Sequence, residues 1–386
     1  MSFDLVIVGA GLAGLSLACA LRDTHLKIAL IENKTPVSPD DWDARVYAIS
    51  PTNADFLRQI GVWKHLDARR LAPIRAMRII GDAEGRLDFS AYASGVPELG
   101  WIVESSLMAN ELWENAKRQA NLTLFCPATV RALSFDDDAA RLTLADGQVL
   151  ATRLLVGADG RDSWVRTAAG LYAIDTPYNE HGVVANFTCE HPPLGLARQW
   201  FRKDGILAWL PLPGRRISMV WSTPNAHAQS LLSLSATELC AKVADAGGHE
   251  LGEMSLLTSA KSFPLRLLRV PKIVAPRLVL LGDAAHGLHP LSGHGINLGY
   301  QDVRVLSELL AATPSWQDVG DERLLRRYQR GRREETLLLQ NATHALHQLF
   351  YATLPGFGPL RNNGLNLINA LPAAKNRLVH YALGAF

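Results

Sequence analysis

The sequence lacks an excess of charge of either sign. Its 386 residues include 39 Lys and Arg and 37 Asp and Glu, which gives a formal net charge of +2. No basic stripe interleaved with aromatic residues accompanies this balance. A nucleic-acid-binding protein needs such a positive footprint, so we expect no nucleic-acid partner.

Cysteine is scarce, and long apolar runs are missing. The four cysteines (Cys19, Cys126, Cys189 and Cys240) are far apart and form no C-x-x-C pair. This spacing fits neither a zinc site nor a disulfide framework and indicates reduced thiols in a cytoplasmic protein. Segments 5–21 and 336–360 carry no charge, but glycine, proline or polar residues interrupt both. We therefore expect neither a signal peptide nor a membrane-spanning helix.

The first forty residues predict a dinucleotide-binding βαβ unit. "FDLVIV" is an apolar strand, "GAGLAG" follows it, and a helical pattern runs from residue 13 to residue 22. Gly9 permits a tight turn, Gly11 lets the backbone approach a pyrophosphate, and Gly14 lets helix and strand pack closely. Glu32 ends the next strand, eighteen residues beyond Gly14, where it can accept a hydrogen bond from a ribose hydroxyl. The motif alone does not separate FAD from NAD.

The middle of the chain alternates between helical and strand patterns. Hairpins are predicted in "MRIIGDAEGRLDFSAY" and around Asp146-Gly147, and a helix capped by serine is predicted in "SSLMANELWENAKRQ". Strand-like runs at 183–189, 205–210 and 216–222 favour an antiparallel sheet inserted between nucleotide-binding segments. In "LLVGADGRDSWVR" a strand enters a turn at 157–160, where Asp159 either caps the next helix or contacts a ligand.

A second glycine-rich stretch, "LLGDAAHGLHPLSGHGINLGYQD", spans residues 280–302 and holds five glycines and three histidines. An apolar strand leads into small residues, a proline and then a helical run. Such a bare backbone serves either an ordinary tight loop or a flat polar ligand lying against it. We interpret His286, His289 and His294 as capping or loop hydrogen-bonding residues. A metal site is not expected, because their loop lacks carboxylates at suitable spacing.

Together, "GAGLAG" with Glu32, "GADGRDSWVR" and "GDAAHGLHPLSGHGINLGYQD" resemble the three signatures of the class A flavoprotein aromatic hydroxylases, which are FAD-dependent monooxygenases. The resemblance spans almost the entire chain. It implies an α/β fold: a Rossmann-like FAD-binding domain of the glutathione-reductase type, an inserted antiparallel β-sheet substrate domain and a helical C-terminus. The implied division assigns 1–72, 102–182 and 265–335 to the FAD-binding domain, 73–101 and 183–264 to the substrate domain, and 336–386 to the C-terminal region.

The resemblance also implies roles for individual residues. Glu32 would hold the adenosine ribose, and Arg45 would lead a segment that runs beside the flavin. Asp159 would serve both FAD and transient NAD(P)H docking, and Asp283 would bind a hydroxyl of the ribityl chain. The residues implied to line the isoalloxazine ring are Pro290, Gly293, Gly295, Ile296 and Asn297. The helix that begins near Gly295 would point its N–H groups at the ring edge that becomes negative on reduction.

Finer features resemble the ubiquinone-biosynthesis branch of the family. They are the form "HGLHPLSGHGINLGYQDV", the segment "WIVESSLMANELW" and the closing segment "LRNNGLNLINALPAAKNRLVHYALG". Three positions depart from the pattern of the branch. Ser105 and Ser106 stand where Asn and often Arg occur, so no flavin contact is expected there. Asp283 keeps the aspartate of the wider class, where some ubiquinone enzymes have Asn.

The implied activity is hydroxylation of the aromatic ring of a polyprenylated phenol in ubiquinone biosynthesis. NAD(P)H would reduce FAD, O2 would add, and a flavin C4a-hydroperoxide would transfer the hydroxyl group. The expected partners extend to a ubiquinone-biosynthesis protein complex and to peripheral contact at the inner membrane surface. The sequence identifies no catalytic base. Two alternatives stay open: a class A hydroxylase of a small soluble aromatic, and a non-catalytic flavin-binding component of a biosynthetic complex.

Overall fold

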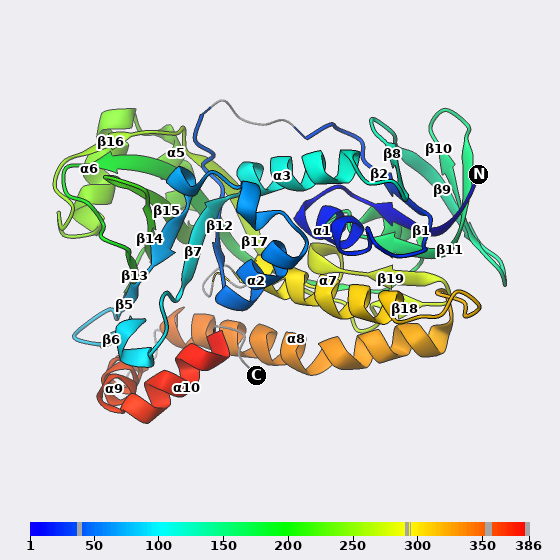
Figure 1. The fold of residues 1–386 in the computed structure, drawn as a ribbon. Helices are drawn as coiled ribbons and strands as arrows, with labels where there is room; N and C mark the ends of the chain where they lie inside the picture. Colours follow the sequence, from blue (N-terminus) through cyan, green and yellow to red (C-terminus); the bar gives the residue numbers. More distant parts are fainter. Residues whose placement is uncertain (37–40, 290–292, 294, 352–356, 383–386) are drawn as a thin grey trace.

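The first strand lies inside a largely parallel sheet. The structure is a computed structural model that describes every residue except 37–40, 290–292, 294, 352–356 and 383–386 (Figure 1). Five of the seven residues of β1 are buried, as expected for a parallel strand covered on both faces. The sheet order is β18-β19-β11-β1-β2-β8, and β10 and β9 extend it beside β11. Its strands are β1 (Ser2–Val8), β2 (Ile28–Ile31), β8 (Leu122–Phe125), β9 (Val130–Phe135), β10 (Ala140–Leu144), β11 (Val149–Gly157), β18 (Val274–Ala275) and β19 (Leu278–Leu280).

Helices cover this sheet and join its segments. α1 (Leu12–Ala20) follows β1 and contacts both α3 (Ser105–Lys117) and α7 (Gly295–Ala311). α2 (Pro51–Gln59) packs on α7, with the Phe56 and Tyr300 ring centres 6.1 Å apart. α4 (Trp164–Ala168) follows β11. The predicted serine cap of α3 is wrong, because Glu104 occupies the cap position and Ser105 is the first helical residue.

A second sheet has the order β16-β12-β15-β14-β13-β5-β6, with β17 also paired to β12. All its neighbours are antiparallel except β13 and β5. The predicted hairpin in 77–92 is present as β5 and β6. The strand β13 was not predicted from the sequence. Its strands are β5 (Ala76–Ile80), β6 (Arg86–Ser90), β12 (Ile174–Cys189), β13 (Leu196–Arg202), β14 (Gly205–Leu212), β15 (Arg216–Pro224), β16 (Met254–Leu256) and β17 (Lys261–Arg269).

Short elements complete the two regions. Two helices, α5 (Asn225–Ser233) and α6 (Ala236–Ala246), follow β15 in the chain. A small third sheet has the order β3-β7-β4 and comprises β3 (Val46–Ile49), β7 (Gly100–Glu104) and β4 (Ala72–Ile74). Single 3-10 turns are η1 (Trp63–His65), η2 (Ala68–Arg70), η3 (Tyr92–Ser94) and η4 (Gly282–Ala284).

Three long elements cross the expected domain boundaries. β12 pairs with β17 from Ile174 onward, so the second sheet begins before residue 183. β17 spans the boundary at 264–265, and α8 (Glu322–Tyr351) spans the one at 335–336. Each element continues across the expected boundary because its backbone N–H and C=O groups need hydrogen-bond partners along its whole length. In Figure 1 the two large sheets lie at opposite ends of the view, and α8 runs below them.

The last helices cover an open sheet edge. α9 (Phe357–Ala370) packs on β6, the edge strand of the second sheet, and α10 (Pro372–Ala382) follows it. Asparagine side chains of α9 accept hydrogen bonds from backbone N–H groups of this hairpin. Gly85 N donates to Asn362 Oδ1 at 3.0 Å, Arg86 N to Asn366 Oδ1 at 2.9 Å, and Asp88 N to Asn369 Oδ1 at 3.1 Å. Covering an edge in this way blocks pairing with another chain.

Candidate functional site: four turns and a buried polar network

Four chain segments meet at one edge of the first sheet. β1, β2, β11 and β19 run parallel, so their carboxyl ends lie together. The chain proceeds from β1 to β2 on one side and places β11 on the other. A crevice outside the strand ends is expected at such a switch point. Backbone bonds join the segments: Ala158 N donates to Val8 O at 2.8 Å, and Leu281 N donates to Gly157 O at 3.1 Å. The predicted turns therefore converge.

The three glycines of the first turn have different surroundings. Gly9 has φ +106°, and a Cβ there would lie 2.4 Å from Ala158 O. A Cβ on Gly14 would lie 2.0 Å from Gly9 O, so both positions require glycine for packing. A Cβ on Gly11 would meet nothing within 4 Å. Gly11 is also the N-cap of α1 and supplies no side-chain cap, which leaves the first N–H groups of the helix available for a phosphate.

Glu32 lies directly beside the first turn. Its Oε2 accepts a hydrogen bond from Ala10 N at 2.7 Å, and its Oε1 accepts one from Asn33 N at 2.8 Å. These bonds hold the carboxylate at the carboxyl end of β2, half-buried. The acid therefore lies where a ribose next to the pyrophosphate would need an acceptor, and its role as a ribose ligand stays a prediction.

Arg45 lies at the start of β3, and its side chain is exposed. Its guanidinium lies 5.3 Å from the centre of the Tyr47 ring. Asp43 fixes this segment to the start of α3, because it accepts hydrogen bonds from Arg45 N at 2.9 Å and Ser106 N at 3.1 Å. Glu104, fully buried, accepts a further one from Asp43 N at 2.6 Å.

Asp159 supports the start of α4, whose N-cap residue is Ser163. Ser163 Oγ donates to Asp159 Oδ1 at 2.5 Å, and Val165 N donates to Asp159 Oδ2 at 3.0 Å. The capping interpretation is therefore present in the structure, while the contact with FAD and NAD(P)H stays a prediction. Arg166 links this turn to the third one, because its Nη1 donates to Ala284 O at 2.9 Å.

Asp283 lies in η4, and its side chain is exposed. Its charge acts on the same tyrosine as that of Arg45: burial raises the pKa of Tyr47, Arg45 opposes this shift, and the negative charge of Asp283 adds to it. Two predicted ligands from distant segments, Arg45 and Asp283, are thus brought together around Tyr47. An exposed carboxylate at this place can accept hydrogen bonds from a polyhydroxyl chain.

Around the start of α7, Asn297 is the residue that binds the neighbouring segments together. Its Nδ2 donates to Ala48 O at 2.7 Å and to Gly293 O at 3.3 Å, and its Oδ1 accepts from Ser50 N at 2.9 Å. Gly295 is the first helical residue, and a Cβ there would meet nothing within 4 Å. Ile296 is half-buried. Pro290 and His294 lie outside the described residues, so the predictions for them are not addressed.

A buried ionic network supports the third turn. Asp302 is fully buried and pairs with His286 at 2.6 Å and with Arg332 at 2.7 Å, and it accepts from Gly282 N at 2.9 Å. Burial alone would raise the pKa of Asp302, but the charges and hydrogen bonds of His286 and Arg332 lower it. The interpretation of His286 as a loop hydrogen-bonding residue is confirmed. The network joins η4 to α7 and α8, which fixes Asp283 in place.

A second buried group lies around His289. Glu180, His289 and His347 each offer a ligand-type atom, and these atoms all lie within 4.8 Å of one another. The sequence argument against a metal considered only carboxylates in the loop, whereas Glu180 comes from β12. Sequence reasoning missed Glu180, His347, Asp302 and Arg332. The available signal was the spacing of His344, His347 and Tyr351, which places all three along one stripe of a helix.

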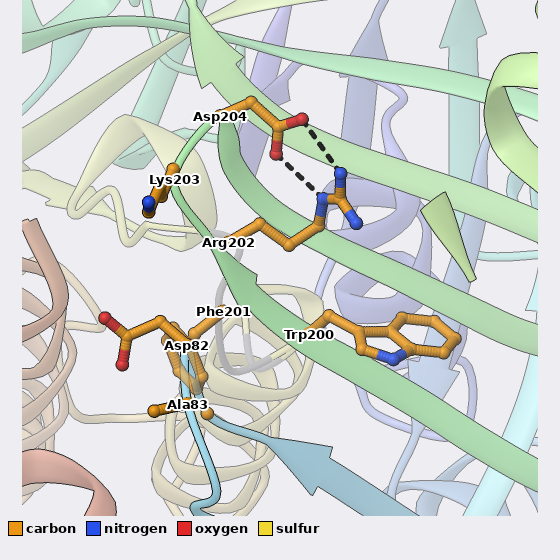
Figure 2. A pocket seen from close by; sticks show the side chains of 8 residues that line it. Asp82, Ala83, Trp200, Phe201, Arg202, Lys203 and Asp204 are labelled. Carbon is orange, nitrogen blue, oxygen red and sulfur yellow. Dashed lines mark hydrogen bonds and ion pairs between the residues drawn. The ribbon is translucent and has the colours of Figure 1, made fainter. Parts of the chain in front are cut away.

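A hollow of about 360 Å³ lies at the edge of the second sheet. Figure 2 shows Trp200 and Phe201 pointing to different sides of β13, and the Arg202–Asp204 ion pair near the end of that strand. The residues that line the hollow are Gly81, Asp82, Ala83, Trp200, Phe201, Arg202, Lys203 and Asp204. None of them belongs to the four turns, so this hollow is separate from the strand ends where the turns meet.

The family model described as "FAD binding domain" matches residues 2–340. The chain is 32% identical over 385 residues to 3-demethoxyubiquinol 3-hydroxylase from Escherichia coli, covering 99% of this chain and 98% of that protein. It is 34% identical over 384 residues to ubiquinone hydroxylase UbiL from Rhodospirillum rubrum, covering 99% and 89%. Among solved structures, PqsL from Pseudomonas aeruginosa, a probable FAD-dependent monooxygenase, superposes with a TM-score of 0.80 at 21% identity, covering 95% and 100%. That likeness shows an α/β fold shared with FAD-dependent monooxygenases.

Proposed function

This chain belongs to the family of FAD-dependent aromatic hydroxylases, and we propose that it hydroxylates the ring of a polyprenylated phenol on the route to ubiquinone. Its cofactor is FAD, and its co-substrates are O2 and, as is typical of the family, NAD(P)H. The observation that carries the proposal is the convergence of the four turns on open space at the N-terminus of α1. Similarity over nearly the whole chain to two ubiquinone hydroxylases supports the substrate class.

The site residues proposed to hold FAD follow the order of the cofactor. Gly11 and the N-terminus of α1 would bind the pyrophosphate, and Glu32 would bind the adenosine ribose. Asp283 would bind the ribityl chain, with Arg45 beside the flavin. Bound FAD supplies the oxygen-transfer chemistry. The chain supplies placement and exclusion of water.

We retain the division into an FAD-binding domain of the glutathione-reductase type and an inserted substrate domain as part of the proposal. The strand order supports it, since the first sheet holds all four turns and the second is almost entirely antiparallel. The border at 182 is then better placed before β12, and the borders at 264 and 335 after β17 and α8.

The test is a product assay with purified, FAD-loaded protein. A short-tailed polyprenylphenol and a hydroxybenzoate are offered separately with NAD(P)H and isotopically labelled O2. We expect one labelled oxygen atom on the prenylated ring and none on the hydroxybenzoate. Labelled hydroxybenzoate would instead indicate the alternative, a hydroxylase of small soluble aromatics. If neither NADH nor NADPH reduces the flavin, the result would favour a non-catalytic flavin-binding component.

Peripheral contact with the inner membrane surface is part of the same proposal, because a substrate with an oily tail resides in the bilayer. No helix among the described residues has the length and apolarity needed to cross a membrane. The last two helices carry exposed leucines, which support insertion of side chains into an interface. These are Leu360 and Leu367 on α9, Leu371 between the helices and Leu378 on α10, with exposed fractions of 63%, 62%, 47% and 44%.

Liposome flotation tests this contact. We expect the protein to float with vesicles that carry the substrate, and a Leu360→Ser/Leu367→Ser variant to stay in the dense fraction. The variant Leu194→Ser is a matched control, since Leu194 is also exposed but lies in the second sheet region. Equal recovery of all proteins with and without vesicles would remove the support for membrane contact. Co-purification from cell extracts tests association with other proteins of the pathway in the same way.

A further inference from the structure

Glu180, His289 and His347 form a buried polar cluster where three parts of the fold meet. Glu180 lies on β12 of the second sheet, His289 follows η4, and His347 lies on α8. Their exposed fractions are 5%, 0% and 4%. His289 directly precedes the segment that we expect to line the flavin ring. The cluster thus joins the second sheet to α8 and to the chain that follows η4.

The backbone of β12 is adapted to place this cluster. The pairing of β12 with β17 shifts register between Pro177 and Glu180. Asn179, within the shift, has φ +59°, a left-handed conformation that costs a non-glycine residue free energy. Bulges of this kind often lie beside functional sites, where they redirect a side chain. Here the bulge immediately precedes Glu180.

Glu180 is a buried anion held by imidazoles. Its Oε2 lies 3.4 Å from His289 Nε2 and 3.1 Å from His347 Nε2, and no Lys or Arg among the described residues forms an ion pair with it. Burial alone would raise the pKa of Glu180, but hydrogen bonds from His289 and His347 lower it to about 2. The carboxylate is therefore ionised at neutral pH and accepts hydrogen bonds from both rings.

His347 has the arrangement of a carboxylate-supported base. Because Nε2 of His347 faces the Glu180 carboxylate, this nitrogen carries the proton and Nδ1 carries the lone pair. Within the described part of the chain, His347 Nδ1 is buried without a hydrogen-bond partner. The Tyr351 ring stacks on His347 with centres 4.4 Å apart, and burial together with the nearby Glu180 carboxylate raises the pKa of the Tyr351 hydroxyl. A buried imidazole nitrogen without a partner, beside a tyrosine that stays protonated, indicates a place for a polar ligand group.

The same three ligand-type residues could in principle hold a divalent metal, but one observation disfavours it. A metal-bound imidazole normally donates its other ring N–H to a carboxylate or carbonyl, which fixes the ring. His347 Nδ1 meets no such acceptor among the described residues. An imidazole with its free nitrogen ready to accept a proton accounts for the geometry without a further partner.

We propose that the Glu180–His347 pair, with Tyr351 beside it, binds the hydroxyl group of the phenolic substrate and removes its proton. The inference rests on the proposed function. In the step, the phenol O–H bond breaks, the proton moves to His347 Nδ1, and the electron pair stays on the oxygen. Glu180 stabilises the imidazolium that forms, as a carboxylate does behind a catalytic histidine. The phenolate is a more electron-rich ring, which favours attack on an electrophilic oxygen.

The charged and titratable groups around His347 come from several elements. Tyr178 lies against it with ring centres 4.5 Å apart and donates or accepts a hydrogen bond at His344 Nδ1. Within the described residues, the set comprises Tyr178, Glu180, His289, His344 and Tyr351, with Arg161, Asp204 and Arg269 acting on members of it by charge. A pH dependence of product formation is assigned to His347 only if it disappears when this side chain is replaced.

The first measurement is ionisation of a bound phenol, which needs no oxygen transfer. A nitrophenol probe is titrated into FAD-loaded protein below its own pKa, and phenolate absorption is recorded. We expect phenolate to form on wild-type protein and on a His344→Gln control from the same helix, but not on Glu180→Gln or His347→Gln. Phenolate of equal intensity on all four proteins would overturn the proposal.

The second measurement is hydroxylation across pH. His347→Gln should lose about 100-fold in product formation at neutral pH, the usual contribution of a positioned base. FAD content and flavin reduction without substrate should not change. A more acidic fluorinated phenol should restore much of the lost rate, and the low-pH limb of the wild-type profile should vanish in the variant. An equal loss with both phenols, or lost FAD, would indicate a structural role and overturn the proposal.

Two further outcomes separate the possibilities. If wild-type protein forms bound phenolate but yields no oxygenated product, the proposed function fails while this inference stands. If elemental analysis finds one equivalent of a transition metal in wild-type protein and none in Glu180→Gln, the cluster is a metal site and the inference is wrong. Should His347→Gln fail to fold, Glu180→Gln carries both measurements, because it keeps the size of the side chain.

Discussion

Around Gly11 the chain offers backbone N–H groups and open space, whereas around Asp302 and Glu180 it offers buried side chains that hold one another. Gly11 is exposed and meets nothing within 4 Å of its Cβ position. Asp302 and Glu180 are 0% and 5% exposed. The first region can admit a large anion at little cost in structure. The second can change the charge state of a small group, because electrostatic interactions are stronger at the low dielectric constant of the protein interior.

The two regions also fail in different ways. A backbone cradle is lost when a side chain is added, since bulk there occupies ligand space or overlaps another main chain. A buried polar network is lost when a side chain is removed, since its partner then keeps an uncompensated charge. The variants below test this contrast in order of decreasing effect.

Gly14→Val should have the largest effect. The new Cβ would overlap Gly9 O at 2.0 Å, and the backbone of α1 cannot move away without leaving the sheet. We expect a cost of about 3 kcal/mol or more, the upper part of the overpacking range. The yield of folded protein and the urea midpoint measure it. A variant with wild-type stability would show that α1 and β1 are less tightly packed than described.

Asp302→Asn should destabilise by about 3 kcal/mol, because it leaves Arg332 buried with less compensation. The folded pKa of Asp302 is lowered, so its stabilisation is present above the ordinary pKa of a free aspartate and is lost as pH falls toward the lowered value. The difference between wild type and variant in urea unfolding should therefore shrink below about pH 4. A difference that stays constant down to that pH would contradict the ionic role.

Gly11→Val should leave the fold intact and remove the cofactor. Its side chain enters space that is open in the protein but needed by the pyrophosphate. We expect FAD affinity to fall about 100-fold, or about 3 kcal/mol, with the apoprotein melting temperature unchanged. Fluorescence titration of apoprotein with FAD gives the affinity. Yellow protein after gel filtration would show that the pyrophosphate binds elsewhere.

Asp283→Ala should have the smallest effect of the four. It removes a charge-assisted hydrogen bond to the ribityl chain, typically worth about 1.5–3 kcal/mol. The fold should not change, since the Asp283 side chain is exposed. Asp283→Asn is the matched control and should recover part of the affinity. If FAD binds Asp283→Ala as tightly as it binds wild-type protein, Asp283 is not a ligand.

The sequence predicts a region well when the residues that form it lie close together in the chain. Gly9, Gly11 and Gly14 are explained within one turn, so their spacing was sufficient to predict a phosphate-binding strand–turn–helix. Glu180 and His347 are 167 residues apart in the chain, and only the crossing of β12 and α8 brings them together. Asp159 shows the limit from the other side, because the sequence left capping and ligand contact both open, and the bonds that its carboxylate makes become visible only in the structure.

The sequence marks domain borders weakly for a related reason, and the predicted division stays a prediction. β12 and α8 continue through positions 182 and 335. A long element is held by hydrogen bonds along its length, and no single residue marks where its surroundings change from one region to the other.

The asparagine contacts of α9 have a consequence for truncated forms of this chain. Three N–H groups of the β5–β6 hairpin rely on Asn362, Asn366 and Asn369 for their acceptors. A chain that ends after α8 would keep both sheets but present that strand as a template for a neighbouring molecule. Such a fragment would self-associate, and its turbidity would rise with concentration even if its flavin site were undamaged.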